Sequence, residues 1–86
     1  LDFTKDRLLL DEAINNADFH TLGTIAHKMQ TMIGQFQEND LLQILKSLEI
    51  KTKSITTSRE IDFELHNLRL LLNKFHEKIN RLAQID

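Results

Sequence analysis

The chain has 86 residues, with 11 Lys and Arg against 13 Asp and Glu, so its formal net charge is −2. That length fits one domain, and a near-neutral charge without a basic cluster argues against a nucleic-acid-binding protein, whose affinity comes from neutralising phosphates. The sequence contains no Cys, no Pro and two Gly, which excludes disulfides and cysteine-ligated metal sites and favours long helices. No apolar run approaches the roughly 18 residues of a membrane span, so we expect no membrane contact. The first residue is Leu1 rather than Met, and we expect the chain to be a piece of a longer protein.

The first half of the chain predicts two amphipathic helices, over residues 4–16 and 19–37. Asp2 or Thr4 is available as the N-cap of the first helix, and Asp18 as the N-cap of the second. The apolar stripe of the first helix is formed by Leu9 or Leu10, Ala13, Ile14 and Ala17. The apolar residues of the second recur every three or four positions and are Phe19, Leu22, Ala26, Met29, Ile33 and Phe36.

The second half predicts a short helix over residues 40–51, a polar Thr-rich linker, and a long helix over residues 58–83. Asn39 or Asp40 would cap the short helix, and residues 57–60 have the S/T-x-x-E form of a capping box, so the long helix should begin near Ser58. The inner face of the short helix is Leu41, Ile44 or Leu45, and Leu48. The apolar residues of the long helix alternate in steps of four and three over about three heptads. They are Ile61, Leu65, Leu68, Leu72, Phe75, Ile79 and Leu82.

The stripe of the long helix has two interpretations. Leu70 and Leu71 widen it, which favours a helix buried against more than one neighbour in a bundle. The strict repeat would also suit pairing with a second copy of the chain. Four amphipathic helices with mostly short connections predict an all-α, up-down-up-down four-helix bundle, formed as one domain over residues 1–86. A self-contained bundle is expected to be a monomer.

The side chains most able to carry chemistry are the four histidines, which are His20, His27, His66 and His76. Ligands for one metal ion on one helix are usually three or four residues apart, and these histidines are not spaced in that way. No metal site is therefore predicted. His20, His66 and His76 are interpreted as solvated or boundary positions.

His27 is different, because it lies about 130° from the centre of the apolar face of its helix, at about 100° per residue. Its ring should therefore face water. Gly23 and Gly34, together with Thr31, share its face. Each interior Gly costs a helix roughly 1 kcal/mol relative to Ala, so both require a reason. One reason is close packing against another helix, and the other is a low surface on which another protein approaches the imidazole.

An exposed neutral imidazole is a competent nucleophile at neutral pH. Phosphoryl transfer also needs stabilisation of the charge on the transferred group. The sequence has no Gly-rich phosphate loop and no obvious acidic cluster for Mg²⁺ near His27. If His27 takes part in phosphoryl transfer, a partner must supply the metal and most of the electrostatics. The domain would then be a carrier without turnover of its own.

The segment from Asp18 to Glu49 resembles the histidine phosphotransfer (HPt) domain of bacterial phosphorelays. The family pattern is roughly D-x-x-x-L-x-x-x-A-H-x-L-K-G, followed further on by L-x-x-x-x-x-x-L-E. The matching residues are Asp18, Leu22, Ala26, His27, Leu41, Leu48 and Glu49, with Met29 in place of Leu. The resemblance implies a four-helix bundle in which His27 is the phosphoacceptor, with its Nε2 expected to attack.

The resemblance also implies the partners, the cofactor requirement, the location and the parent chain. The partners would be aspartyl-phosphate receiver domains, which donate and accept the phosphoryl group and bring their own Mg²⁺, so that this domain binds no cofactor. The location would be cytoplasmic, and the parent chain a hybrid sensor histidine kinase, which can be membrane-bound. The receiver would dock over Gly23, Thr24 and Gly34, and the phosphoryl group would have Lys28, Gln30 and Thr31 as neighbours.

Two positions depart from the family pattern. Gln30 stands where the family has Lys, and Thr31 where it has Gly. An amide donates a hydrogen bond but supplies no charge, and Lys28 can compensate only in part. Two alternatives therefore stay open: a module that docks receivers without transferring a phosphoryl group, and a helical scaffold or dimerisation bundle.

Overall fold

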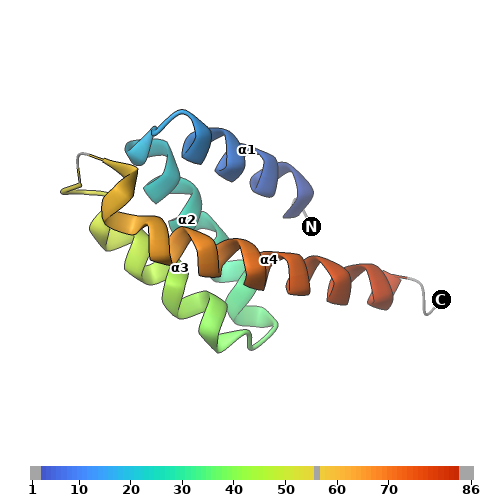
Figure 1. Ribbon diagram of the computed structural model, residues 1–86. Coiled ribbons are helices and arrows are strands. Elements are labelled where there is room, and N and C mark those ends of the chain that lie inside the picture. Colours follow the sequence, from blue (N-terminus) through green and yellow to red (C-terminus); the bar gives the residue numbers. More distant parts are fainter. Residues whose placement is uncertain (1–2, 56, 84–86) are drawn as a thin grey trace.

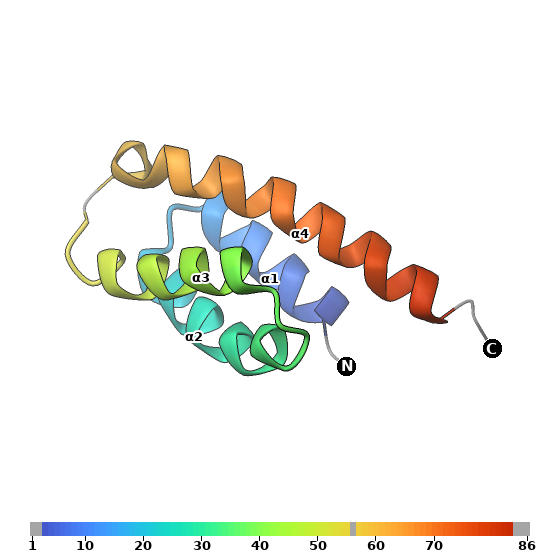
Figure 2. The same ribbon diagram turned by 90° about the horizontal axis from the view of Figure 1, so that it is seen from below.

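The computed structural model describes residues 3–55 and 57–83, which form four α-helices and one 3₁₀ turn (Figure 1). The elements are α1 (Phe3–Asn15), α2 (Phe19–Gln35), α3 (Asn39–Lys51), the 3₁₀ turn η1 (Ser58–Ile61) and α4 (Asp62–Ala83). Successive helices run in opposite directions (Figures 1 and 2), which confirms the up-down-up-down bundle. The predicted boundaries differ from the observed ones by no more than two residues, except at the start of the last helix. There the predicted first turn, Ser58–Ile61, is the 3₁₀ turn η1, and α4 itself begins at Asp62.

Two of the predicted helix starts are confirmed by their hydrogen bonds. The Asp18 carboxylate accepts from the backbone N–H of Thr21 at 3.2 Å and from the Thr21 hydroxyl at 2.6 Å. These bonds hold the pKa of the Asp18 carboxyl below its ordinary value. At the start of η1, the N–H of Thr57 donates to the Glu60 carboxylate at 3.1 Å, as a capping box requires.

The other two starts differ from expectation. The N-cap of α3 is Glu38, so the prediction of Asn39 or Asp40 was wrong. The chain re-enters the helix directly after Gln37, whose φ is 57°, and the Glu38 side chain accepts from Lys78 of α4 at 2.7 Å instead of capping α3. Helix α1 already includes Phe3, so Thr4 lies inside it, while Asp2 is outside the described residues.

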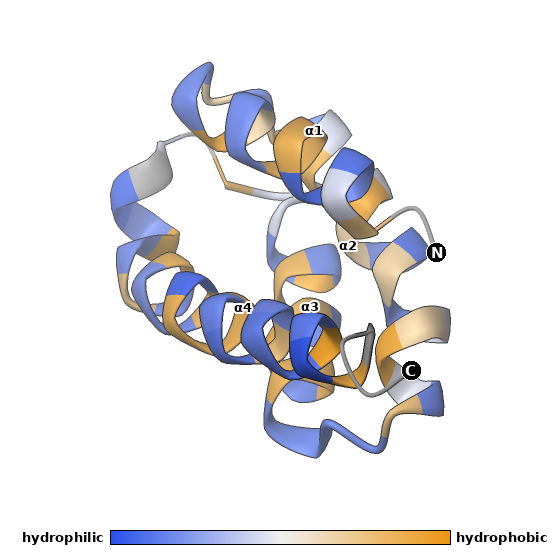
Figure 3. Cartoon of the chain, turned by 90° about the vertical axis from the view of Figure 1, so that its right-hand side faces the viewer, coloured by the Kyte–Doolittle hydropathy of each residue, from blue (hydrophilic) through white to orange (hydrophobic). Residues whose placement is uncertain are grey.

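The apolar faces of the helices meet in one core (Figure 3), whose buried residues include Leu10, Leu22, Met29, Ile33, Leu45, Leu48, Leu68 and Leu72. In α1, Leu10 rather than Leu9 is buried, and Ala17 lies exposed in the following turn. Sequence periodicity did not single out Phe3 of α1 or Ile25 of α2, which are buried too.

The stripe of the last helix points into this core over most of its length, since Ile61, Leu65, Leu68, Leu72 and Phe75 are buried. These five side chains therefore pack within their own bundle, as the first interpretation of the stripe predicts. Leu71 is half-buried as expected, whereas Leu70 is 49% exposed and does not widen the stripe. Helix α4 extends beyond the other helices at its C-terminal end (Figures 1 and 2), which leaves Leu82 50% exposed.

Candidate functional site

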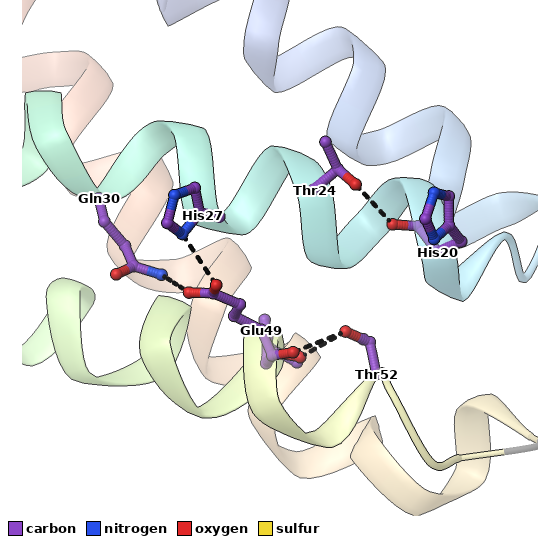
Figure 4. A network of polar contacts seen from close by, with 7 residues as sticks. His20, Thr24, His27, Gln30, Glu49 and Thr52 are labelled. Atoms are coloured by element: carbon purple, nitrogen blue, oxygen red, sulfur yellow. Dashed lines mark hydrogen bonds and ion pairs between the residues drawn. The ribbon is translucent and has the colours of Figure 1, made fainter.

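His27 lies midway along α2 and its side chain is 72% exposed, which confirms that it faces water. The side chains that α2 buries are Leu22, Ile25, Ala26, Met29 and Ile33, and they point away from it into the core. The ring is nevertheless held on one side. Its Nδ1 lies 2.8 Å from Oε2 of Glu49, which reaches across from α3 (Figure 4).

The Glu49 carboxylate joins His27 to a second residue of α2, because its other oxygen accepts from the Gln30 amide at 2.7 Å. This bond, together with the charge and hydrogen bond of His27 and the charge of Lys53, holds the pKa of the Glu49 carboxyl below its ordinary value. The carboxylate is therefore ionised at neutral pH and acts as an acceptor. That places the proton of the neutral imidazole on Nδ1 and leaves the lone pair of Nε2 available for attack.

An open groove of ≈ 550 Å³ lies beside His27, between α2 and the C-terminal end of α3. Its lining is formed by Phe19, His20, Gly23, Thr24, His27, Glu49, Thr52 and Lys53. Thr24 is exposed, and its hydroxyl donates to the backbone oxygen of His20 at 3.0 Å (Figure 4). The groove thus combines an apolar end at Phe19 with the basic side chains of His20 and Lys53.

The three residues expected to neighbour a phosphoryl group on His27 have different surroundings. Gln30 shares the Glu49 carboxylate with the imidazole. Lys28 instead reaches α1, where its ammonium lies 3.1 Å from the carboxylate of Asp6. Thr31 is exposed on the surface of α2. The structure therefore links Gln30 with His27 and ties Lys28 to another helix.

The two glycines of α2 are also not equivalent. A Cβ atom at Gly23 would lie 2.4 Å from Oγ1 of Thr52, so close helix packing explains the glycine there. A Cβ atom at Gly34 would have nothing within 4 Å, and Gly34 is exposed. Packing therefore gives no reason for the glycine at position 34, which leaves the second reason offered by the sequence, a low surface for an approaching protein.

Sequence reasoning gave no role to Glu49, Thr52, Lys53 or Asp6. Glu49 had a signal, because it stands in the L-x-x-x-x-x-x-L-E part of the family pattern. The roles of Thr52, Lys53 and Asp6 depend on contacts between different helices. The spacing of residues along one helix could not have predicted them.

No three His, Asp or Glu side chains in residues 3–55 and 57–83 are grouped so that they could hold a metal ion. Nor does any helix in the described part of the chain have the length and apolar character needed to cross a membrane. Comparisons with protein-family models, with curated proteins and with solved structures found no match. The feature of this chain that points to a function is therefore the exposed imidazole of His27, held at Nδ1 by Glu49.

Proposed function

We propose that this chain is a histidine phosphotransfer domain, in which His27 accepts a phosphoryl group from an aspartyl-phosphate receiver domain and passes it to another receiver. The observation that carries the proposal is the exposed imidazole whose Nδ1 is held by Glu49 at 2.8 Å, so that Nε2 is the nucleophilic nitrogen. The resemblance of residues 18–49 to the HPt pattern points to the same histidine.

In the transfer step, the Nε2 lone pair attacks the phosphorus of the aspartyl phosphate. The N–P bond forms as the P–O bond to the receiver's aspartate breaks, and the aspartate leaves as a carboxylate. The proton on Nδ1 stays in place, so the ring of the phosphorylated product carries a positive charge. The Glu49 carboxylate opposite Nδ1 stabilises that charge. Transfer to the second receiver is the reverse of this step.

The charge on the transferred phosphoryl group must be stabilised as well. Mg²⁺ bound by the receiver would act as the Lewis acid. Within this chain, Lys28 is paired with Asp6, and Gln30 supplies no charge. Lys53, in contrast, lines the groove beside His27 and lies close enough to Glu49 for its charge to lower the pKa of that carboxyl. We assign to Lys53 the cationic role that the HPt pattern gives to the Lys replaced here by Gln30.

The receiver would approach over the exposed surface of α2 around His27. Gly34 and Thr24 are exposed on this helix, and the groove provides a recess into which a receiver side chain can fit. Because the chain contributes one nucleophile and returns to its starting state only by losing the phosphoryl group, it is a carrier without turnover of its own. As the family resemblance implies, it would act in the cytoplasm with receivers as its partners.

The test is transfer from a ³²P-labelled receiver to the wild type, to His27→Gln and to the control His20→Gln. His20 is a matched control because it is exposed and lines the same groove. We expect acid-labile, base-stable label on the wild type and on His20→Gln, and none on His27→Gln. Receiver binding without label on the wild type would favour the docking module instead. Neither binding nor label would favour the helical scaffold.

A further inference from the structure

Gly23 on α2 lies directly against Thr52 at the C-terminal end of α3. A Cβ atom at position 23 would lie 2.4 Å from Oγ1 of Thr52 but 3.5 Å from its Cβ. The first distance is too short for any stable contact, whereas the second is an ordinary van der Waals contact. One oxygen atom of Thr52 therefore explains why position 23 requires glycine.

That oxygen is not free to move aside. The Thr52 hydroxyl donates to the backbone oxygen of Leu48 at 2.7 Å and lies 3.3 Å from that of Glu49 (Figure 4). Thr52 is the C-cap of α3 and is 8% exposed. Rotating the hydroxyl away would break its bond at the helix end. A side chain at position 23 would therefore be accommodated by moving this end of α3 away from α2.

The end of α3 that would move carries Glu49, about one turn before Thr52. On α2, His27 follows Gly23 by about one turn. The two contacts thus lie next to each other across the same helix pair, and all four residues line the same groove. A shift of α3 at Thr52 would be transmitted to the 2.8 Å contact between Glu49 and the imidazole.

We propose that Gly23 and Thr52 are positioning residues, whose contact sets the separation of α2 and α3 at which Glu49 reaches Nδ1 of His27. The glycine is then needed for helix spacing and not as part of a docking surface. The effect on phosphoryl transfer rests on the proposed function. The effect on the imidazole needs no partner and can be measured on the isolated protein.

The test compares Gly23→Ala with Gly34→Ala, the same substitution in the same helix at a position where a Cβ meets nothing within 4 Å. A double variant, Gly23→Ala/Thr52→Ala, removes the clashing oxygen and keeps the Cβ of residue 52. Two readouts are recorded on each protein: the ¹⁵N and ¹H signals of the His27 ring, which report the Nδ1–H bond to Glu49, and the transfer rate. Thermal unfolding shows that each variant is folded.

We expect Gly23→Ala to lose the signature of the Nδ1–H bond and to slow transfer about tenfold or more, because a misplacement of about 1 Å can cost up to about 10²-fold. Gly34→Ala should keep the ring signals of the wild type, because a Cβ at that position meets nothing within 4 Å, and the double variant should recover both readouts. The proposal is overturned if Gly23→Ala keeps the ring signals of the wild type, or if the double variant recovers neither readout. Slower transfer with unchanged ring signals would show that Gly23 contacts the receiver. If the wild type accepts no phosphoryl group but the ring signals respond as expected, the proposed function fails and the positioning role stands.

Discussion

Lys28 and Lys53 both lie near His27, and replacing each by Met should have opposite consequences. The side chain of Asp6 is 8% exposed, so Lys28→Met leaves its carboxylate buried without the ammonium group 3.1 Å away. Losing the partner of a buried polar group costs about 1–3 kcal/mol. Because the Lys28 side chain is 62% exposed and solvent screens the pair, the lower part of that range, about 1–2 kcal/mol, is appropriate. For a domain of this size, the melting temperature should fall by about 4–16 °C.

Lys53→Met should instead leave the melting temperature nearly unchanged, because an exposed substitution usually stays within about 0.5 kcal/mol. It should slow transfer by about 1.4- to 5-fold, if the Lys53 ammonium contributes about 0.2–1 kcal/mol to the charged transition state. Thermal unfolding followed by circular dichroism and single-turnover transfer from a phosphorylated receiver measure the two effects. If Lys28→Met slows transfer more than Lys53→Met and leaves the melting temperature unchanged, the assignment of the two lysines is refuted.

Three further predictions follow from the same contacts. Glu49→Ala should redistribute the imidazole proton from Nδ1 to Nε2 and slow transfer, whereas Glu49→Gln should keep it on Nδ1 and still slow transfer through the lost charge. Identical ¹⁵N ring shifts in both variants and the wild type would contradict this. Leu68→Ala, in the core, should cost about 2–5 kcal/mol, and Leu70→Ala, which is 49% exposed, less than about 0.5 kcal/mol. Equal costs in denaturant unfolding would mean that the stripe is not packed inside the bundle. Finally, hydrogen bonds from Gln30 and Lys51 lower the pKa values of the Glu49 and Glu64 carboxyls in the folded state from an ordinary 4.5. Their contribution to the free energy of unfolding is therefore complete above about pH 4.5 and lost as the pH falls through the lowered values. As the pH falls, the free energy of unfolding should therefore decrease less steeply in the Glu49→Gln/Glu64→Gln double variant than in the wild type. An equal decrease in both proteins would show that these carboxyls do not cause it.

Features that depend on one helix at a time could be predicted from the sequence. The angular position of His27 relative to the apolar residues of α2 was enough to predict that its ring is exposed. The Asp18 cap was predictable because capping bonds join residues a few positions apart. The cap of α3 was not, because Glu38 takes its partner, Lys78, from another helix. The capping preferences of single residues could not predict that the Glu38 side chain would pair with Lys78 of α4 instead of capping α3.

Features that depend on two helices could not be predicted. The direction of Lys28 is decided by a buried carboxylate on α1 that lies 22 residues away along the chain. The reason for Gly23 is an oxygen atom on Thr52, at the far end of the neighbouring helix. From the sequence, the two glycines of α2 could be explained either by close packing against another helix or by a low surface for an approaching protein. Which reason applies at each position depends on the helix separation, which only the tertiary structure supplies.

The most direct test of the central claim is to locate the phosphoryl group on the protein after transfer. Heteronuclear ³¹P, ¹⁵N and ¹H NMR of the product distinguishes phosphorylation at Nε2 from phosphorylation at Nδ1 and assigns the residue. Because Glu49 holds Nδ1 of His27 at 2.8 Å, the phosphoryl group is predicted on Nε2 of His27. A product on Nδ1, on another histidine, or no phosphohistidine with an active receiver would contradict the account.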